Sequence, residues 1–381
     1  MDLGALLPEL FKGLTHFTLG NAVMIAVGMI LVYLAVAKEY EPVLLLPIGF
    51  GCILANIPLA GMTAGEGTSA AEGMMSVLYN AGIKTELFPL LIFVGVGAMI
   101  DFSPLLAQPK MVLLGAAGQF GIFGTLIVAI LLGFPLNQAA SIGVIGAIDG
   151  PTSIFVASKL APELLAPIAV AAYSYMSLIP IIQPPLMRLL TTKKERMIRM
   201  DYSPRPISQK TLVAFPILLT LAVGLLVPEA TPLISMLMLG NLLKVSGVVA
   251  RLSKAAENEI INIATLFLGL AIGATMSAAA FLNLVTIQIM LLGLMAFVLD
   301  TVAGLLFGKL MSALSGGKIN PLIGAAGISA FPMAGRLAAR MASEEDPDNF
   351  ILMHAMGANT AGQLGSVMAG GILLAIVSKL V

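Results

Sequence analysis

Residues 139–160 read AASIGVIGAIDGPTSIFVASKL, an apolar stretch with a broken centre that decides the fold. Its length is close to the roughly 20 mostly apolar residues that a helix needs to cross the hydrocarbon core of a bilayer. Gly150 and Pro151 interrupt the helical pattern directly after Asp149. Proline removes a backbone donor, and its ring clashes with the preceding turn. The stretch therefore predicts a membrane helix that is broken beside an acidic residue.

The composition of the whole chain agrees with a membrane protein. The 381 residues are 59% hydrophobic and 10% charged with zero net charge, whereas soluble domains carry about 25% charged residues. Zero net charge excludes a nucleic-acid binder, because no basic excess is present to hold phosphates. Cys52 is the single cysteine, which excludes a disulfide framework and a thiolate metal cluster. We predict an all-α polytopic membrane protein.

Apolar segments are numerous enough for about eleven α-helical spans, several of them interrupted. The uninterrupted candidates are 18–37, 43–61, 111–134, 211–227 and 284–308. Those broken by Gly, Pro or polar residues are 88–106, 139–160, 231–249, 262–282 and 319–337, and two long ones are 163–189 and 350–378. We expect residues 1–17 to form a short interfacial helix. The run 18–37 is longer than the 7–15 apolar residues of a signal peptide, so we expect it to remain as the first span.

Basic residues gather in one connection, 191–210, which contains Lys193, Lys194, Arg196, Arg199, Arg205 and Lys210. Lysine and arginine concentrate in cytoplasmic loops, so this linker is expected on the cytoplasmic side. The other interpretation is a docking surface for a soluble partner. The linker divides the chain into an N-terminal interfacial helix with the first span (1–40), a first repeat (41–190) and a span with a second repeat (211–381).

The two halves share short blocks in the same order. The matching pairs are 91–98 with 267–274, 145–147 with 323–325, 159–160 with 336–337, and 167–175 with 351–359. The last pair sets Tyr175 opposite Asn359. Each repeat, 41–190 and 231–380, holds five spans, and an odd number requires the second copy to be inverted. Inverted repeats with broken helices recur in transporters, which bind their substrate where the broken helices meet. Chance similarity between Gly/Ala-rich helices is the alternative.

Asp149 is the main candidate for a functional residue. A charge at the bilayer centre costs ~2.5–3.5 kcal/mol, so charges inside spans mark functional sites by default. The hydroxyls of Thr152 and Ser153, with carbonyls freed by Gly150 and Pro151, complete an all-oxygen site. Hard cations prefer oxygen ligands, which predicts Na⁺ at Asp149. A capping or ion-paired aspartate is the alternative.

The matching break, residues 320–336, reads NPLIGAAGISAFPMAGR and lacks an acid. Ser329 supplies its hydroxyl, so the two breaks together carry one negative charge, which suits a proton or a monovalent ion. Arg336 would bind an anion or extend to the interface. Tyr175 would donate a proton or be satisfied at the interface, and Asn359 would offer an amide oxygen or pack between helices. The sequence assigns no role to Asp101, Asp300 or His354.

Three motifs together resemble a known family: GAIDGPTS at 146–153, YSYMSLIPIIQPP at 173–185, and the series Asn320, Ser329, Arg336. The chain resembles, over nearly its whole length, the β subunit of the biotin-dependent, sodium-pumping decarboxylases of oxaloacetate, methylmalonyl-CoA or glutaconyl-CoA. The resemblance implies that the chain takes carboxybiotin from a soluble partner, decarboxylates it and exports Na⁺ while consuming a proton. The implied partners are a carboxyltransferase and biotin-carrier subunit and a small membrane γ/δ subunit, in the inner (cytoplasmic) membrane, with a homo-oligomer possible.

The resemblance also implies residue roles. Asp149 would bind Na⁺, Tyr175 would handle the proton, and Arg336 would face carboxybiotin. Asn320 and Ser329 would belong to the ion path, and Gly324 would allow close helix approach. Asn359 joins them because of its pseudo-symmetric position. Two alternatives stay open on the sequence: a secondary cation/proton antiporter, and a non-catalytic membrane anchor.

Overall fold

The computed structural model describes residues 11–60, 62, 73–201 and 206–381, and these residues are all helical or irregular. The helices of the first half are α2 (Lys12–Thr15), α3 (Leu19–Ala37), α4 (Pro42–Ala55), α5 (Met74–Leu78), η1 (Tyr79–Ile83), α6 (Leu87–Met99), α7 (Ser103–Ala107), η2 (Pro109–Met111), α8 (Val112–Ala117), α9 (Phe120–Leu131), α10 (Leu136–Gly143), η3 (Val144–Ala147), α11 (Gly150–Leu160), η4 (Pro162–Leu164) and α12 (Leu165–Leu190).

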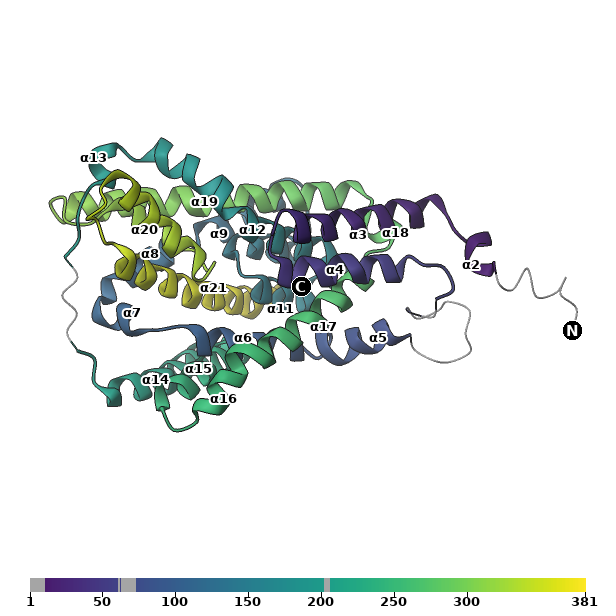
Figure 1. The fold of residues 1–381 in the computed structure, drawn as a ribbon, viewed down its shortest axis with the longest axis horizontal. Helices are drawn as coiled ribbons and strands as arrows, with labels where there is room; N and C mark the ends of the chain where they lie inside the picture. Colours follow the sequence, from purple (N-terminus) through teal and green to yellow (C-terminus); the bar gives the residue numbers. More distant parts are fainter. Residues whose placement is uncertain (1–10, 61, 63–72, 202–205) are drawn as a thin grey trace, which may run out of the picture.

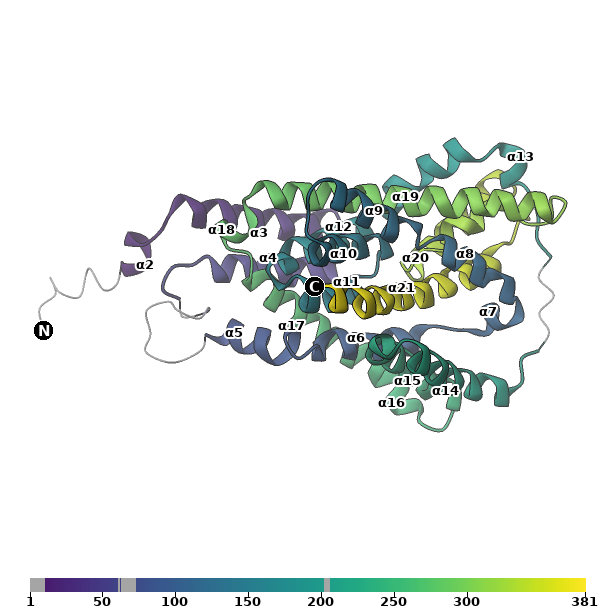
Figure 2. The same ribbon diagram turned by 180° about the vertical axis from the view of Figure 1, so that it is seen from behind.

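The second half continues with α13 (Lys193–Arg196), α14 (Gln209–Leu226), η5 (Pro228–Ala230), α15 (Thr231–Ser246), α16 (Ala250–Ala255), η6 (Ala256–Ile260), α17 (Ile261–Ala274), α18 (Ala278–Phe281), α19 (Leu284–Leu314), η7 (Pro321–Ala326), α20 (Met333–Glu345) and α21 (Leu352–Leu380). Figures 1 and 2 show α19 along one long edge of the molecule and α14, α15 and α16 along the opposite edge. Of the interfacial helix expected over 1–17, the described part holds only α2, and residues 1–10 lie outside the described residues.

Six of the described helices are long and apolar enough to cross a membrane: Leu19–Ala37, Pro109–Leu131, Gln209–Leu226, Ala250–Ala274, Leu284–Leu314 and Leu352–Leu380. The number rises to eight if two bent pairs, Met74–Ile83 with Leu87–Met99 (58°) and Pro162–Met176 with Leu178–Leu190 (60°), each count as one span. This is fewer than the eleven expected. The two segments with polar breaks fold into pieces, α10 with α11 and η7 with α20, that are too short to cross by themselves.

The bend in α12 follows from its prolines. Pro180, Pro184 and Pro185 lie inside the helix. Each lacks the backbone N–H that would close a helical turn, so a proline-rich helix bends near the free carbonyls. The 31-residue α19 contains no proline and is uninterrupted. The side chain of Asn283 accepts a hydrogen bond from the Thr286 N–H at 2.9 Å and caps its first turn.

Glycines allow two pairs of helices to touch backbone to backbone. Helix α4 packs against α17, and α6 packs against α15. A Cβ added to Gly51 or Gly273 would lie 2.5 or 2.2 Å from a carbonyl oxygen of the opposite helix. A Cβ added to Gly97 or Gly240 would lie 1.9 Å from a carbonyl oxygen of the opposite helix. Small residues at such crossings bring helix backbones together, as in membrane helix packing.

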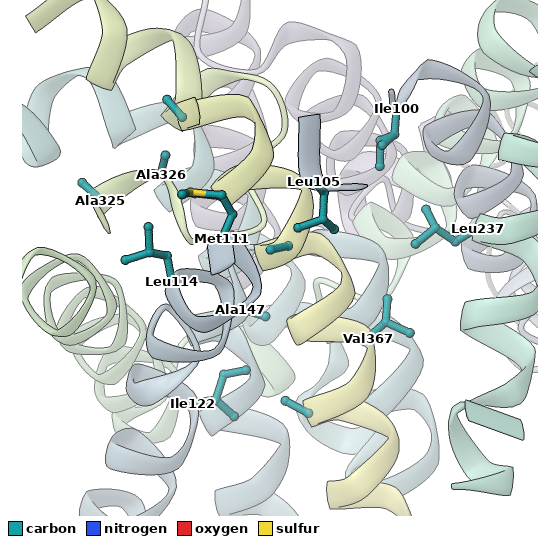
Figure 3. Close-up of a cluster of buried hydrophobic side chains, with 14 of the residues drawn as sticks. Ile100, Leu105, Met111, Leu114, Ile122, Ala147, Leu237, Ala325, Ala326 and Val367 are labelled. Carbon is teal, nitrogen blue, oxygen red and sulfur yellow. The ribbon is translucent and has the colours of Figure 1, made fainter. Parts of the chain in front are cut away.

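One hydrophobic core joins the two halves of the chain. Its buried members include Leu105, Met111 and Leu114 from the first half and Ala325 and Ala326 from η7. Figure 3 shows these side chains close to the α21 segment that carries Val367. The second broken segment therefore lies in the interior of the molecule and not at its edge.

Residues 191–201 of the basic linker are docked on the end of α20. The Arg196 guanidinium lies 2.6 Å from Glu345, and Arg199 lies 2.6 Å from Asp346. These contacts hold the pKa of the Glu345 carboxyl and the pKa of the Asp346 carboxyl below their ordinary values. Two of the basic side chains are thus neutralised within the chain, which weakens the interpretation of the run as a docking surface. Arg205 falls outside the described residues.

Candidate functional site

Asp149 lies in the gap between two short helices, as the break in the sequence predicts. Helix η3 ends at Ala147, and Ile148 follows with a left-handed φ of 51°. Helix α11 begins at Gly150 with Pro151 in its first turn, where a missing N–H costs no hydrogen bond. Oxygen Oδ1 of Asp149 accepts a hydrogen bond of 3.4 Å from the Thr152 N–H. The aspartate therefore does cap α11, which was the alternative interpretation, although through a long bond.

The second carboxylate oxygen of Asp149 has three further partners. Oδ2 accepts hydrogen bonds from Thr152 Oγ1 at 2.7 Å, from Gln363 Nε2 at 2.7 Å and from Ser366 Oγ at 3.0 Å. Asp149 is only 5% exposed, and among the described residues no ion pair includes it. A buried carboxylate without a paired charge is costly. The site therefore favours the arrival of a proton or a metal cation.

The second broken segment crosses the first at this point. The Ser329 N–H donates to the Ala147 carbonyl at 3.3 Å, and the Ser329 hydroxyl donates to the Gly362 carbonyl of α21 at 2.9 Å. Asn359 donates through Nδ2 to the Ile328 carbonyl at 2.7 Å. Its Oδ1 is buried without a partner in the described part of the chain. Both breaks and α21 thus meet around Asp149, and Ser329 and Asn359 lie at the crossing.

Gln363 and Ser366 are functional candidates that the sequence analysis missed. Both lie on α21, where Asn359 and Gln363 are four positions apart and Gln363 and Ser366 are three apart. Residues with these spacings share one face of a helix. This row of polar side chains in an otherwise apolar span was a signal that could have identified the face of α21 that contacts Asp149.

A cavity of about 320 Å³ opens beside Asp149. It is lined by Glu41, Val43, Leu44, Ile92, Val96, Met99, Ile148, Asp149, Gly150, Pro151, Tyr173, Met176, Glu257, Ile261, Asn262, Thr265, Ser329, Phe331 and Gln363. Tyr173 lies against the break, because a Cβ on Gly150 would be only 2.0 Å from its ring. Its hydroxyl is buried without a hydrogen-bond partner in the residues that the structure describes.

Tyr175 points to a different part of the molecule. Its hydroxyl donates to the Met290 carbonyl of α19, and its ring packs on Gly293. Ser153 donates to the carbonyls of Val144 and Asp149, at 3.2 and 3.0 Å, so its hydroxyl stabilises the break. Of the two phenols in this helix, Tyr173 is the one that lines the Asp149 cavity.

Three other candidates, Asn320, Arg336 and Gly324, do not line the Asp149 cavity. Asn320 caps η7 by accepting from the Leu322 N–H, and its Nδ2 donates to the carbonyls of Arg196 and Ile198 at 2.8 and 2.9 Å. It therefore joins the break to the linker. Arg336 is exposed on α20 and makes no ion pair within the described ranges. Gly324 meets α19, where an added Cβ would lie 2.0 Å from the Gly304 carbonyl oxygen.

The other acids and the histidine contribute to local structure. Asp300 is fully buried on α19 and accepts a hydrogen bond from the Gly121 N–H. Asp101 accepts from the Ser103 N–H at 2.9 Å. His354 is buried at the start of α21. Within the described residues, no three His, Cys, Asp or Glu side chains form a group that could hold a metal ion. The candidate ligands around Asp149 are instead one carboxylate with hydroxyl, amide and carbonyl oxygens.

Comparison with known proteins gives consistent matches along the chain. Residues 20–377 match the family described as "Na+-transporting oxaloacetate decarboxylase beta subunit". The methylmalonyl-CoA decarboxylase subunit beta of Veillonella parvula is 55% identical, covering 97% of this chain and 96% of the relative. The glutaconyl-CoA decarboxylase subunit beta of Acidaminococcus fermentans is 54% identical, over 96% of each chain. The oxaloacetate decarboxylase beta chain of Haemophilus ducreyi is 47% identical, covering 97% of this chain and 98% of the relative.

Proposed function

The chain belongs to the β-subunit family of the Na⁺-transporting decarboxylases, and we propose that it decarboxylates carboxybiotin carried by a partner subunit and couples this reaction to Na⁺ export with consumption of a proton. The chain is a membrane subunit of a sodium-pumping decarboxylase.

Three different acyl substrates in the names of the relatives support carboxybiotin as the shared substrate. Chains that are 47–55% identical to this one are named for methylmalonyl-CoA, glutaconyl-CoA and oxaloacetate decarboxylases. A conserved architecture is poorly suited to recognising three unlike acyl groups, so we place acyl recognition on a carboxyltransferase partner. Carboxybiotin supplies a carboxylate on a ring nitrogen, which leaves as CO₂ while the nitrogen takes up a proton. A biotin-carrier subunit and a small membrane γ/δ subunit complete the proposed complex.

Na⁺ binding at Asp149 rests on the arrangement of neutral groups around its carboxylate. The three side chains that donate to Oδ2 carry no charge, so an arriving cation meets no competing cation. The hydroxyls of Thr152 and Ser366 can turn their lone pairs toward an ion. A half-turn of the Gln363 amide replaces its N–H donor with an oxygen ligand. The same carboxylate can take a proton when the ion leaves, so that one site would bind Na⁺ and a proton alternately. We call this binding site at Asp149 the ion seat.

The proton taken up in the reaction needs a donor within reach of the site. The family resemblance assigns this role to Tyr175. The position of Tyr173 supports a different role for that phenol, since its hydroxyl, which has no hydrogen-bond partner among the described residues, lines the Asp149 cavity, whereas Tyr175 donates to the Met290 carbonyl. We propose that Tyr173 contacts the Na⁺ ion bound at Asp149. Tyr175 would be the proton donor, at the contact between α12 and α19.

Two correspondences support an inverted repeat as the moving part. The π-helical turns η1 and η6 lie 177 positions apart and precede the aligned helices α6 and α17. The crossing of α4 with α17 also repeats in the crossing of α15 with α6. In both, a glycine meets an opposite carbonyl at equivalent positions, Gly273 with Ile48 and Gly97 with Leu237. We propose five elements per repeat that rock about the Asp149 crossing, with linker 191–210 in the cytoplasm and the chain in the inner membrane.

The proposed function is tested with the complete complex in proteoliposomes. Decarboxylation should drive ²²Na⁺ uptake, and avidin should stop both, because it sequesters the biotin on the partner. Asp149→Asn should abolish Na⁺-coupled decarboxylation while the complex still assembles. Exchange of Na⁺ for protons that continues in the presence of avidin would refute the proposal and favour the antiporter. Unchanged pumping by Asp149→Asn would refute the assignment of the ion seat.

A further inference from the structure

The cavity beside Asp149 is lined by acidic ionisable side chains from separate parts of the fold. Glu41 precedes the first turn of α4, and Glu257 lies in the π-helical turn η6 before α17. In the described part of the chain no lysine, arginine or histidine lines this cavity, and neither glutamate makes an ion pair. Three carboxylates thus share one cavity with no compensating charge. Such a cleft concentrates cations and repels anions.

Burial increases along the three acids. Glu257 is exposed, Glu41 is half-buried, and Asp149 is 5% exposed. The acids therefore lead from the outside of the cavity to the buried crossing. Neutral oxygen-bearing side chains, Asn262 and Thr265, lie on the same wall as Glu257. A cation that enters can exchange hydration water for protein oxygens in steps, which avoids losing its hydration shell all at once.

Tyr173 is an independent sign of a ligand in this cavity. Its side chain is 4% exposed, and its hydroxyl has no hydrogen-bond partner among the described residues. It lies within electrostatic range of both Asp149 and Glu41. Leaving a buried hydroxyl unpaired costs about 1–3 kcal/mol. A hydrated cation passing between the two carboxylates would supply the missing partner for this hydroxyl.

We infer that Glu41 and Glu257 form an entrance site for Na⁺, which collects the ion and passes it by way of Tyr173 to Asp149. This inference rests on the proposed Na⁺ seat at Asp149. The negative charge that attracts Na⁺ also keeps the anionic carboxybiotin out of this cavity. The decarboxylation therefore takes place at a different surface of the protein, and the cavity serves the ion alone.

The test uses the complete complex with Glu41→Gln, Glu257→Gln and the double variant. The control is Glu259→Gln, which lies in the same π-helical turn but does not line the cavity. At about 10 mM ionic strength, we expect the double variant to raise the apparent KM for Na⁺ about tenfold, because charged clefts change local ion concentration by this order. We expect kcat at saturating Na⁺, and the KM for the biotinylated partner, to stay within twofold of wild type.

Added choline chloride provides a second measurement. The Debye length falls from about 30 Å at 0.01 M to about 8 Å at 0.15 M, so the difference between wild type and double variant should shrink. A Na⁺ KM equal to that of Glu259→Gln at low salt would overturn the inference. A fall in kcat with unchanged KM would also overturn it, because the carboxylates would then act in the chemistry.

A readout without turnover separates this inference from the proposed function. Na⁺ should raise the Tm of the purified complex, and the double variant should need about tenfold more Na⁺ for half of the effect. The Tm without Na⁺ checks that the variant is folded. Decarboxylation that does not depend on Na⁺ in the wild type would refute the proposed function. An unchanged Na⁺ midpoint for the double variant, with the wild type responding, would refute the entrance site alone.

Discussion

Asp149→Asn should remove Na⁺ binding without unfolding the protein. The new amide carries two N–H groups, so the Thr152 hydroxyl and the Gln363 amide, which now donate to Oδ2, can reverse to accept hydrogen bonds from it. The Ser366 hydroxyl keeps its hydrogen bond to the Gln363 carbonyl. We therefore expect little change in Tm. A hard cation contacts a carboxylate oxygen at about 2.4 Å. At an effective dielectric constant of about 20, the Coulomb attraction at that distance is about 7 kcal/mol.

Desolvation of the ion and the carboxylate offsets a large part of this attraction. If half is lost in this way, about 3.5 kcal/mol remains, which corresponds to a roughly 300-fold weaker Na⁺ affinity. The assay is the Na⁺ concentration that gives half-maximal decarboxylation by the complex in proteoliposomes, with ²²Na⁺ uptake measured in parallel. Asp300→Asn is the matched control, since Asp300 is a buried aspartate on another helix that does not line the cavity.

Two outcomes would refute the reasoning. A Na⁺ requirement for Asp149→Asn within threefold of the wild type would show that the carboxylate is not the ion seat. A large fall in Tm would show that Thr152 and Gln363 cannot reverse their hydrogen bonds, so that the loss of activity reports unfolding. Asp300→Asn should leave the Na⁺ requirement unchanged even if the complex becomes less stable.

Four further substitutions test other parts of the structure. Tyr173→Phe should raise the Na⁺ requirement several-fold, whereas Tyr175→Phe should lower kcat with little effect on that requirement; the reverse pattern would exchange the roles of the two phenols. Gly97→Ala would place a Cβ 1.9 Å from a carbonyl oxygen of α15 and should cost about 1–3 kcal/mol, seen as a lower Tm of the complex. Arg199→Gln should slightly lower the Tm at pH 7, because it removes the partner that depresses the pKa of Asp346. The Tm difference should persist at mildly acidic pH and vanish as the pH falls below the ordinary Asp pKa of 3.8, and a difference that persists below that range would contradict the assignment.

The local sequence was sufficient to predict both breaks, and it offered a helix cap as the alternative role of Asp149. Gly150 and Pro151 act on the backbone within one turn, so their effect does not depend on the rest of the fold. The sequence also predicted that the two breaks meet, on the interpretation of the matched blocks as an inverted repeat. The contact between Ser329 and the Ala147 carbonyl brings the two segments together in the structure.

The choice between two tyrosines could not be made from the sequence. Tyr173 and Tyr175 lie two positions apart on α12, which turns their side chains by about 200° around a helix of 3.6 residues per turn. Only the rotation of α12 against its neighbours decides which one meets Asp149, and that rotation is fixed by contacts such as Tyr175 with Gly293. The same limit applies to Glu41 and Glu257, which reach the cavity from elements distant in the sequence.

The distribution of charge constrains how ion transport is coupled to decarboxylation. The Asp149 cavity holds only acidic ionisable groups within the described residues, whereas Arg336, the proposed contact for carboxybiotin, is exposed on α20 and does not line it. With these proposed sites, the ion and the anionic substrate bind in different places and are not coupled by direct contact in one cavity. Coupling requires that each binds differently to two conformations of the same protein. The second break is suited to transmit the change, because Arg336 follows Ser329 in the chain, and Ser329 contacts the first break beside Asp149.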